Sequence, residues 1–256
     1  MVGLAVAALL LIAGPAQATI TYDTALAAPA GTYYGAGNPN THWVVDNENG
    51  AEIGFKALIR YTGYVAPDNS GTYYVPIGAT TVSGKTGSAW GFAFSLNLSG
   101  AGLVLNDVTT SLQMQDLANG TTGNFDALFL PDNYGYSSSG RDGGSSPLDA
   151  TNDYGFQNSE ALSYASIAAA FGDAGYDMNQ NNTYKFQFSV TCKTGTSCAG
   201  QQLASVNSTV IAGTGAPVRV PEPSSIGIFG AGLLALLGLC LAAARRREHA
   251  TGTHEA

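Results

Sequence analysis

Histidine is scarce in the part of the sequence where chemistry is expected. His42 is the single histidine between residues 19 and 220. A Ser-His-Asp triad would have to use it, because that arrangement needs an imidazole base. No G-x-S-x-G nucleophile motif accompanies His42. We therefore interpret His42 as a polar residue that begins a strand beside Trp43, and we predict no catalytic residue.

Acidic side chains are the second group that could act on a substrate. Fifteen Asp and Glu residues lie between residues 19 and 220. Glycoside hydrolysis needs two of them about 5 to 9.5 Å apart in one cleft, a geometry that the sequence does not reveal. Just over half stand next to Gly, Asn or Pro, as in Pro67-Asp68-Asn69, where turns explain acidic residues. We expect a protein that is not an enzyme, with a secreted glycoside hydrolase as the less favoured alternative.

One motif has the spacing of a calcium-binding loop. Asp177, Asn179 and Asn181 occupy alternate positions, as the first three ligands of such a loop do. The pattern then fails, because Asn182 stands where the loop needs glycine and Phe188 where it needs a bidentate glutamate. We favour a turn before the next strand, and we predict neither a metal site nor a cofactor.

Two cysteines enclose a short loop after a strand-like segment. Cys192 and Cys198 are separated by five residues that include Gly195, a length that suits a hairpin loop. An oxidising compartment would allow the two thiols to join. We predict a disulfide that contributes about 2 kcal/mol, a low value because the closed loop is short.

Tyrosines near loops are the candidates for glycan contact. They lie among Gly, Asn and Ser residues, and they are Tyr33, Tyr34, Tyr73, Tyr74, Tyr134 and Tyr136. Tyrosine rings stack on sugar rings, while neighbouring Asn and Asp side chains bond to hydroxyl groups. Ordinary packing of an amphipathic ring at the rim of a sandwich explains the same residues, so both interpretations stay open.

Residues 1–18 have the pattern of a secretory signal peptide. An apolar run from Val2 to Ala13 is followed by Gly14-Pro15 and by small residues at Ala16 and Ala18. This order is typical of the apolar region and cleavage site of such a peptide. We expect export through the Sec translocon and a mature chain that begins near Thr19.

The other end of the sequence has a three-part pattern. Pro221-Glu222-Pro223 forms an extended segment, because its prolines cannot continue a helix or a ladder. Residues 226–244 then carry no charge and come close to the roughly 20 residues that cross a bilayer as a helix. The basic cluster that follows resists translocation, and it consists of Arg245, Arg246 and Arg247. Residues 248–256 are expected to form a cytoplasmic tail.

This ordered pattern resembles the PEP-CTERM sorting signal of Gram-negative bacteria, here over residues 221–247. The resemblance implies recognition by an exosortase, a membrane cysteine protease that cleaves near the Pro-Glu-Pro motif. It also implies an inner-membrane precursor that is delivered to the cell surface or the extracellular matrix of an exopolysaccharide producer. The part of the chain before the motif resembles no family that we can assign.

Residues 19–211 read as one β-rich domain, followed by a linker over 212–220. Residues 89–98 and 183–191 alternate apolar with small or polar side chains, the period of a half-buried strand. Further strands are expected at 43–45, 51–61, 72–77, 108–114, 125–130 and 204–211. One helix is expected over 161–171, capped by Asn158 or Ser159, and residues 134–150 read as a long loop. The pattern predicts a single antiparallel β-sandwich, jelly-roll-like, with one short helix.

Composition narrows the function further. Glycine contributes 33 of 256 residues, charged residues are only 11%, and the net charge is −8. The glycine content and low charge argue against a coiled coil and against a highly charged disordered chain, and the negative charge argues against nucleic-acid binding. We expect a structural or adhesive protein associated with exopolysaccharide or biofilm, and the alternative is a carbohydrate-binding module.

Overall fold

The structure is a computed structural model that describes residues 19–27, 39–61, 63–130, 132–137, 140–143 and 148–216. The chain divides into Met1–Pro217 and Val218–Ala256, and every described residue belongs to the first unit. The signal-peptide residues 1–18 and the sorting-signal residues 221–247 lie outside the described part. Within the described ranges, no helix is long and apolar enough to cross a membrane. The described fold is mainly β, as the sequence predicts.

The larger sheet follows the order β1-β2-β3-β8-β13-β11-β12, with β4 paired to β3. All its pairings are antiparallel. Its strands are β1 (Thr19–Thr24), β2 (Trp43–Glu48), β3 (Ala51–Ile59), β4 (Gly63–Tyr64), β8 (Trp90–Asn97), β11 (Tyr134–Ser137), β12 (Gly140–Gly143) and β13 (Gly155–Glu160).

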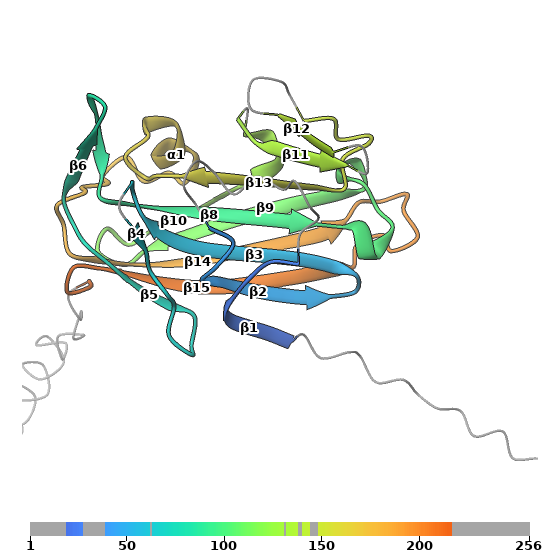
Figure 1. Cartoon of the computed structure of the whole chain (residues 1–256), viewed down its shortest axis with the longest axis horizontal. Helices are drawn as coiled ribbons and strands as arrows, with labels where there is room; N and C mark the ends of the chain where they lie inside the picture. The colour runs from blue at the N-terminus through green and yellow to red at the C-terminus, as the bar shows by residue number, and fades with distance from the viewer. Residues whose placement is uncertain are drawn as a thin grey trace, which may run out of the picture. The chain divides into compact units, whose positions relative to one another are not determined.

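The second sheet follows the order β10-β9-β14-β15-β5 and lies against the first (Figure 1). It is antiparallel except for the parallel pair of β5 and β15. Its strands are β5 (Thr72–Val75), β9 (Val108–Asp116), β10 (Thr121–Phe125), β14 (Asn182–Cys192) and β15 (Gln202–Ala212). A separate hairpin joins β6 (Ala79–Val82) to β7 (Lys85–Ser88).

Aromatic side chains hold the two sheets together. The inward face of β8 meets the inward face of β14, with ring centroids 5.3 Å apart for Trp90 and Tyr184. The next pair along, Phe92 and Phe186, is separated by 5.1 Å. The last pair, Phe94 and Phe188, is separated by 5.6 Å. The two segments with the clearest alternation in the sequence therefore face each other across the core.

The predicted helix is shorter than expected. Residues 155–160 form strand β13, so Asn158 and Ser159 are strand residues and the predicted caps are wrong. The helix α1 spans only Ala165–Ala170, and Tyr164 precedes it in an extended conformation. Phe171 at its end is fully buried and lies 4.9 Å from the ring of Phe125. The predicted cap residues instead pair with β8 as part of β13.

Two other predicted segments also differ. Strand β10 stops at Phe125, and the rest of the predicted strand 125–130 contains a 3-10 turn over Ala127–Phe129. The carboxylate of Asp126 starts this turn by accepting a hydrogen bond from the Leu128 amide. The predicted loop 134–150 contains β11 and β12. Its glycine content hid these strands, because glycine is unfavourable in strands.

The predicted disulfide between Cys192 and Cys198 is confirmed. It closes the loop between β14 and β15, and the amide of Gly200 donates to the Cys192 carbonyl across it. The predicted linker begins later than residue 212. Ala212 ends β15, and the amides of Gly213 and Thr214 bond to Val75 and Asn181.

The aromatic core yields a stability prediction. Phe188→Ala should lower the free energy of unfolding by about 3 to 5 kcal/mol, because the fully buried ring leaves a cavity between the sheets. Phe129→Ala is the matched control, since Phe129 is 84% exposed and its loss should change stability by less than about 0.5 kcal/mol. Urea unfolding of the two variants checks this, and equal losses would contradict the assignment of the core.

Candidate functional site

The tyrosines named from the sequence do not form one surface. Tyr73 is fully buried, and its hydroxyl donates to the carbonyls of His42 and Phe55. Tyr136 is also buried, and its hydroxyl bonds to the Leu96 carbonyl. For these two rings, burial favours the packing interpretation over glycan contact. Of the remaining four, Tyr74 is exposed and Tyr134 is half-buried, while Tyr33 and Tyr34 lie outside the described residues.

A different aromatic group is exposed where β3 ends. Arg60 follows β3 and lies between the rings of Tyr61 and Tyr164, with its guanidinium carbon 4.9 and 5.1 Å from their centroids. The Nη2 atom of Arg60 donates to both tyrosine hydroxyls at 2.8 Å. Tyr61 is 54% exposed and Tyr164 is 43% exposed. We call these three residues the tyrosine–arginine platform.

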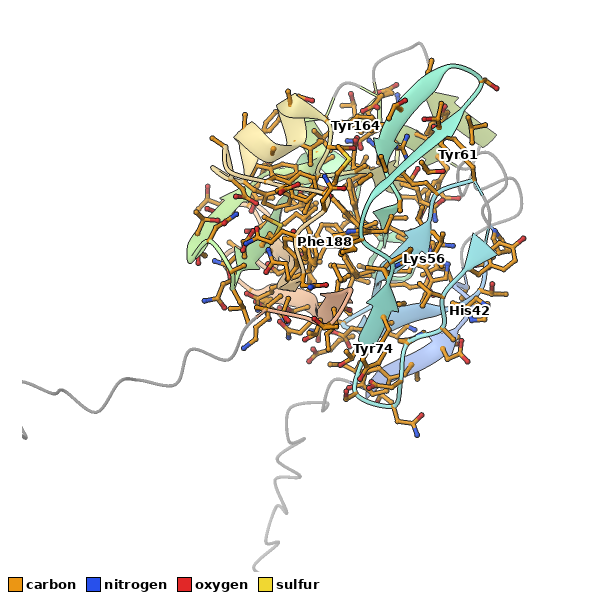
Figure 2. The ribbon with its side chains drawn as sticks, turned by 90° about the vertical axis from the view of Figure 1, so that its left-hand side faces the viewer. His42, Lys56, Tyr61, Tyr74, Tyr164 and Phe188 are labelled. Carbon is orange, nitrogen blue, oxygen red and sulfur yellow. A yellow bond between two sulfur atoms is a disulfide. The ribbon has the colours of Figure 1, made fainter. Side chains whose placement is uncertain are left out.

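Figure 2 shows Tyr61 and Tyr164 close together, and Tyr74 far from them.

The backbone around the platform fixes its shape. The Arg60 amide donates to the Ala89 carbonyl, which anchors the end of β3. Tyr61 has a φ of 65°, a left-handed conformation that costs a residue with a side chain about 1 to 2 kcal/mol. A Cβ on Gly87 would come 2.2 Å from the Arg60 Nη1 atom, so a larger residue at this position would displace the guanidinium. A left-handed backbone at a residue with a side chain, as at Tyr61, is often found at binding sites.

Ser163 fixes the backbone just before Tyr164 and helix α1. The Ser163 hydroxyl accepts a hydrogen bond from the Ser88 amide at the end of β7. The amide of Tyr164 bonds to the Ala161 carbonyl. Tyr164 is thus held by the same region that carries Gly87. The platform is preorganised, which lowers the entropy cost of binding a ligand.

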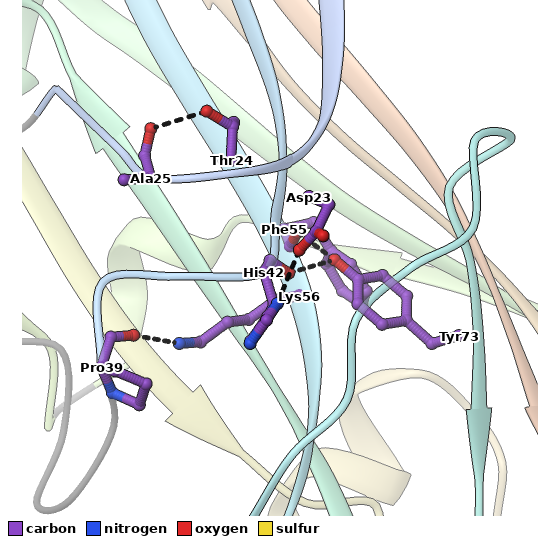
Figure 3. A network of polar contacts seen from close by, with 8 residues as sticks. All are labelled: Asp23, Thr24, Ala25, Pro39, His42, Phe55, Lys56 and Tyr73. Carbon is purple, nitrogen blue, oxygen red and sulfur yellow. Dashed lines mark hydrogen bonds and ion pairs between the residues drawn. The ribbon is translucent and has the colours of Figure 1, made fainter.

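His42 and Lys56 each make polar contacts beside β2 and β3 (Figure 3). The His42 Nδ1 atom lies 2.6 Å from an Asp23 carboxylate oxygen, and the Tyr64 ring stacks on the imidazole at 6.1 Å. Neither of these two partners of the imidazole, Asp23 or Tyr64, is the serine or cysteine nucleophile of an acyl-transfer triad. The buried Lys56 ammonium donates to the Pro39 carbonyl and lies over the Trp43 ring. Burial lowers the pKa of Lys56 to about 8.

Acidic side chains come close together at two places among the described residues, and one of them joins Asp132 and Glu160. The amide nitrogen of Asn158 donates to Asp132 and to Glu160, each at 3.0 Å. Burial, and secondarily the nearby Asp132 carboxylate, raises the pKa of Glu160 to about 8. The two acids also hydrogen-bond to each other, which leaves no room for a glycosidic bond between them. The pair is a local structural contact that the sequence did not indicate, since Glu160 was expected in a helix.

The calcium-like motif forms a turn. The Asp177 carboxylate accepts hydrogen bonds from the amide and side chain of Asn179. The Asn181 side-chain oxygen accepts from the Thr214 amide and so ties the end of β15 to this turn. Within the described ranges, no three His, Cys, Asp or Glu side chains converge as metal ligands would.

Comparisons with known proteins add little. No protein-family model matches the chain, and no curated protein matches it. A solved structure with some similarity is the N-terminal domain of PorA, which is 12% identical and covers 63% of this chain and 98% of that one. Its TM-score is 0.19, so the match carries no information on fold or function.

The buried Glu160 predicts a pH dependence of stability. Its pKa in the folded state is raised above the ordinary value of 4.5, so the folded state binds more protons than the unfolded state between pH 4.5 and 8. Stability should therefore fall as pH rises through this window, by at most about 1.4 kcal/mol per pH unit for one group.

Glu160→Gln should remove this fall between pH 6 and 8, because the glutamine keeps the Asn158 contact without a charge. Urea unfolding at several pH values measures the effect. Parallel pH profiles for the wild type and the variant would show that Glu160 ionises normally.

Proposed function

We propose that this chain is an exported, non-catalytic matrix protein whose β-sandwich contacts polysaccharide through the tyrosine–arginine platform. The observation that carries the proposal is the exposed pair of tyrosine rings held on either side of the Arg60 guanidinium. In this form, the structural or adhesive role and the carbohydrate-binding role expected from the sequence become one function.

The chemistry of the platform suits a sugar chain. Tyrosine rings offer flat apolar faces to the C–H side of a pyranose, and they do so at low cost in conformational entropy. The guanidinium, whose Nη2 atom already donates to the two tyrosine hydroxyls, adds a positive charge that attracts the carboxylate of an acidic sugar. A polysaccharide with uronic acid units would use both features at once.

Features of the sequence support export. The signal-peptide pattern over 1–18 and the PEP-CTERM-like segment over 221–247 favour passage through the Sec translocon and processing by an exosortase. The Cys192–Cys198 disulfide fits an oxidising compartment outside the cytoplasm. The low charge of the chain leaves solubility to its Gly, Ser, Thr and Asn residues.

The finer fold assignment also belongs to the proposal. We assign the two facing sheets to a jelly-roll-like sandwich, because strands far apart in sequence lie side by side in both sheets. Strand β8 pairs with β3 and β13, and β9 pairs with β14. The expected signal helix and membrane helix flank this sandwich in the sequence.

Loss of the platform should weaken polysaccharide binding. We expect Tyr61→Ala and Tyr164→Ala each to lower affinity for an acidic polysaccharide by about fivefold or more, as for central aromatic contacts. Arg60→Gln should weaken binding to the acidic chain more than to a neutral one, since glutamine removes the positive charge. Co-sedimentation of the full-length chain in detergent with each polysaccharide measures this.

Tyr74→Ala is the matched control, because Tyr74 is as exposed as Tyr61 but lies elsewhere. Retention of every polysaccharide by the Tyr61 and Tyr164 variants would contradict the platform. Turnover of the polysaccharide by the wild type would contradict the non-catalytic assignment.

Sorting is tested separately in the producing cell. Glu222→Ala, or deletion of residues 245–247, should leave an unprocessed precursor in the inner membrane, because each change removes one part of the signal. Fractionation and immunoblotting report the size and location of the chain. A mature size unchanged in both variants would refute the PEP-CTERM assignment.

A further inference from the structure

Two buried carboxyl groups meet where the β9–β10 turn contacts the segment after helix α1. Asp116 ends β9 and Asp173 follows α1, and both are fully buried. The side-chain nitrogen of Asn119 donates to both acids, to Asp116 Oδ2 at 3.0 Å and to Asp173 Oδ1 at 3.2 Å. The same nitrogen also donates to the Gly175 carbonyl. A single neutral amide group therefore bridges the two acids.

The donors around this pair do not satisfy it. Asp173 Oδ2 is buried without a hydrogen-bond partner. The Asp116 carboxyl lies within hydrogen-bonding reach of Asp173, but two carboxylates offer only acceptors, so a bond between them needs a proton on one. Neither acid forms an ion pair among the described residues. A shared proton is the compensation that this geometry requires, as in other buried carboxyl pairs.

The surroundings of the pair supply no other compensation. Burial raises the pKa of Asp173 from its ordinary value of 3.8 to about 6, and the Asp116 carboxyl is the second cause. The other charged or titratable groups near the pair, from the elements packed against it, are Tyr176, Tyr184, Asp177 and Arg60. Arg60 acts on Tyr176 and not on Asp173, so no cation of the described residues replaces the proton.

The backbone of α1 connects the pair to the platform. The Asp173 amide donates to the Ala168 carbonyl at 2.8 Å, and the Ala168 amide donates to the Tyr164 carbonyl at 3.0 Å. A movement of Asp173 therefore reaches Tyr164 through one intervening residue. Isolated helices shorter than about 12 residues are marginal, so α1, with six residues, depends on anchors at its ends.

We propose that Asp116 and Asp173 share one proton, and that this proton holds Tyr164 in the tyrosine–arginine platform. When the proton is lost, the two buried charges repel each other, residues 171–176 open locally, and Tyr164 loses its backbone anchor. The platform is therefore complete in acid and loosened at neutral pH. The inference names a regulation of the platform, and its binding part rests on the proposed function.

The direction of the pH effect follows from the closed and open states of the segment. The pKa of Asp173 is about 6 when the segment is closed, and it returns toward 3.8 when the segment opens. The closed state therefore binds more protons. Its stability falls as pH rises from about 4 to about 6, with up to tenfold more opening per pH unit, and levels off above about pH 7.

Hydrogen exchange of the full-length chain in detergent, corrected for the intrinsic pH dependence of exchange, tests the opening. Between pH 4.5 and 7, protection of residues 164–176 in the wild type should fall by about tenfold or more. Asp173→Asn should abolish this fall, because the amide keeps the contacts with Asn119 and Asp116 without a charge. Asp116→Asn should do the same, since it also removes one of the two charges.

Co-sedimentation with an acidic polysaccharide over the same pH range tests the link to the platform. The affinity of the wild type should fall by about threefold or more as the closed state becomes less populated. Asp173→Asn should keep its acid-state affinity at pH 7. Asp46→Asn is the matched control, because Asp46 is a buried acid on β2 that is bonded to the Ser205 amide, and it should leave the exchange of residues 164–176 unchanged.

Each result has a separate meaning. Equal pH profiles of exchange for the wild type and both asparagine variants of the pair would overturn the shared proton. Opening of residues 164–176 with an unchanged affinity would overturn its link to the platform. Exchange that behaves as expected, in a chain that binds no polysaccharide at any pH, would refute the proposed function and support the shared proton.

Discussion

The contact between β8 and β14 is the interaction on which the rest of the structure depends. Three aromatic pairs, one after another along the two strands, fill the space between the sheets. Every other strand of either sheet is attached directly or through neighbours to these two. The platform at the end of β3 follows a strand that pairs with β8. The aromatic core therefore sets the position of the platform.

At two places on the edge of the apolar core, an asparagine side chain bridges two carboxylates. Asn158 donates from one amide nitrogen to Asp132 and Glu160, and Asn119 does the same for Asp116 and Asp173. In each case burial raises a carboxyl pKa, to about 8 for Glu160 and about 6 for Asp173. The bridges join segments distant in sequence, such as the β9–β10 turn and the residues after α1. They add directional hydrogen bonds at the edge of the aromatic core.

The sequence predicted the parts of the fold that follow a simple period. Strands β8 and β14 were found because large and small residues alternate along them. Strand β13 was missed because its inward residues Asn158 and Glu160 are polar, so no apolar alternation marks them. The burial of Tyr73 and Tyr136 depends on neighbours that no local pattern reveals. The platform was missed for the same reason, since Arg60 and Tyr164 lie 104 residues apart.

The position of β15 has a consequence for how the chain folds. This last strand lies between β14 and β5, so the second sheet stays divided until residues 202–212 have been made. Strand β5 pairs with residues 137 positions later in the chain, as Thr72 does with Thr209. A chain emerging from a ribosome therefore cannot complete this sheet in stages. Such distant pairings slow folding, often to milliseconds or seconds, so this sheet closes only after the whole domain has been synthesised.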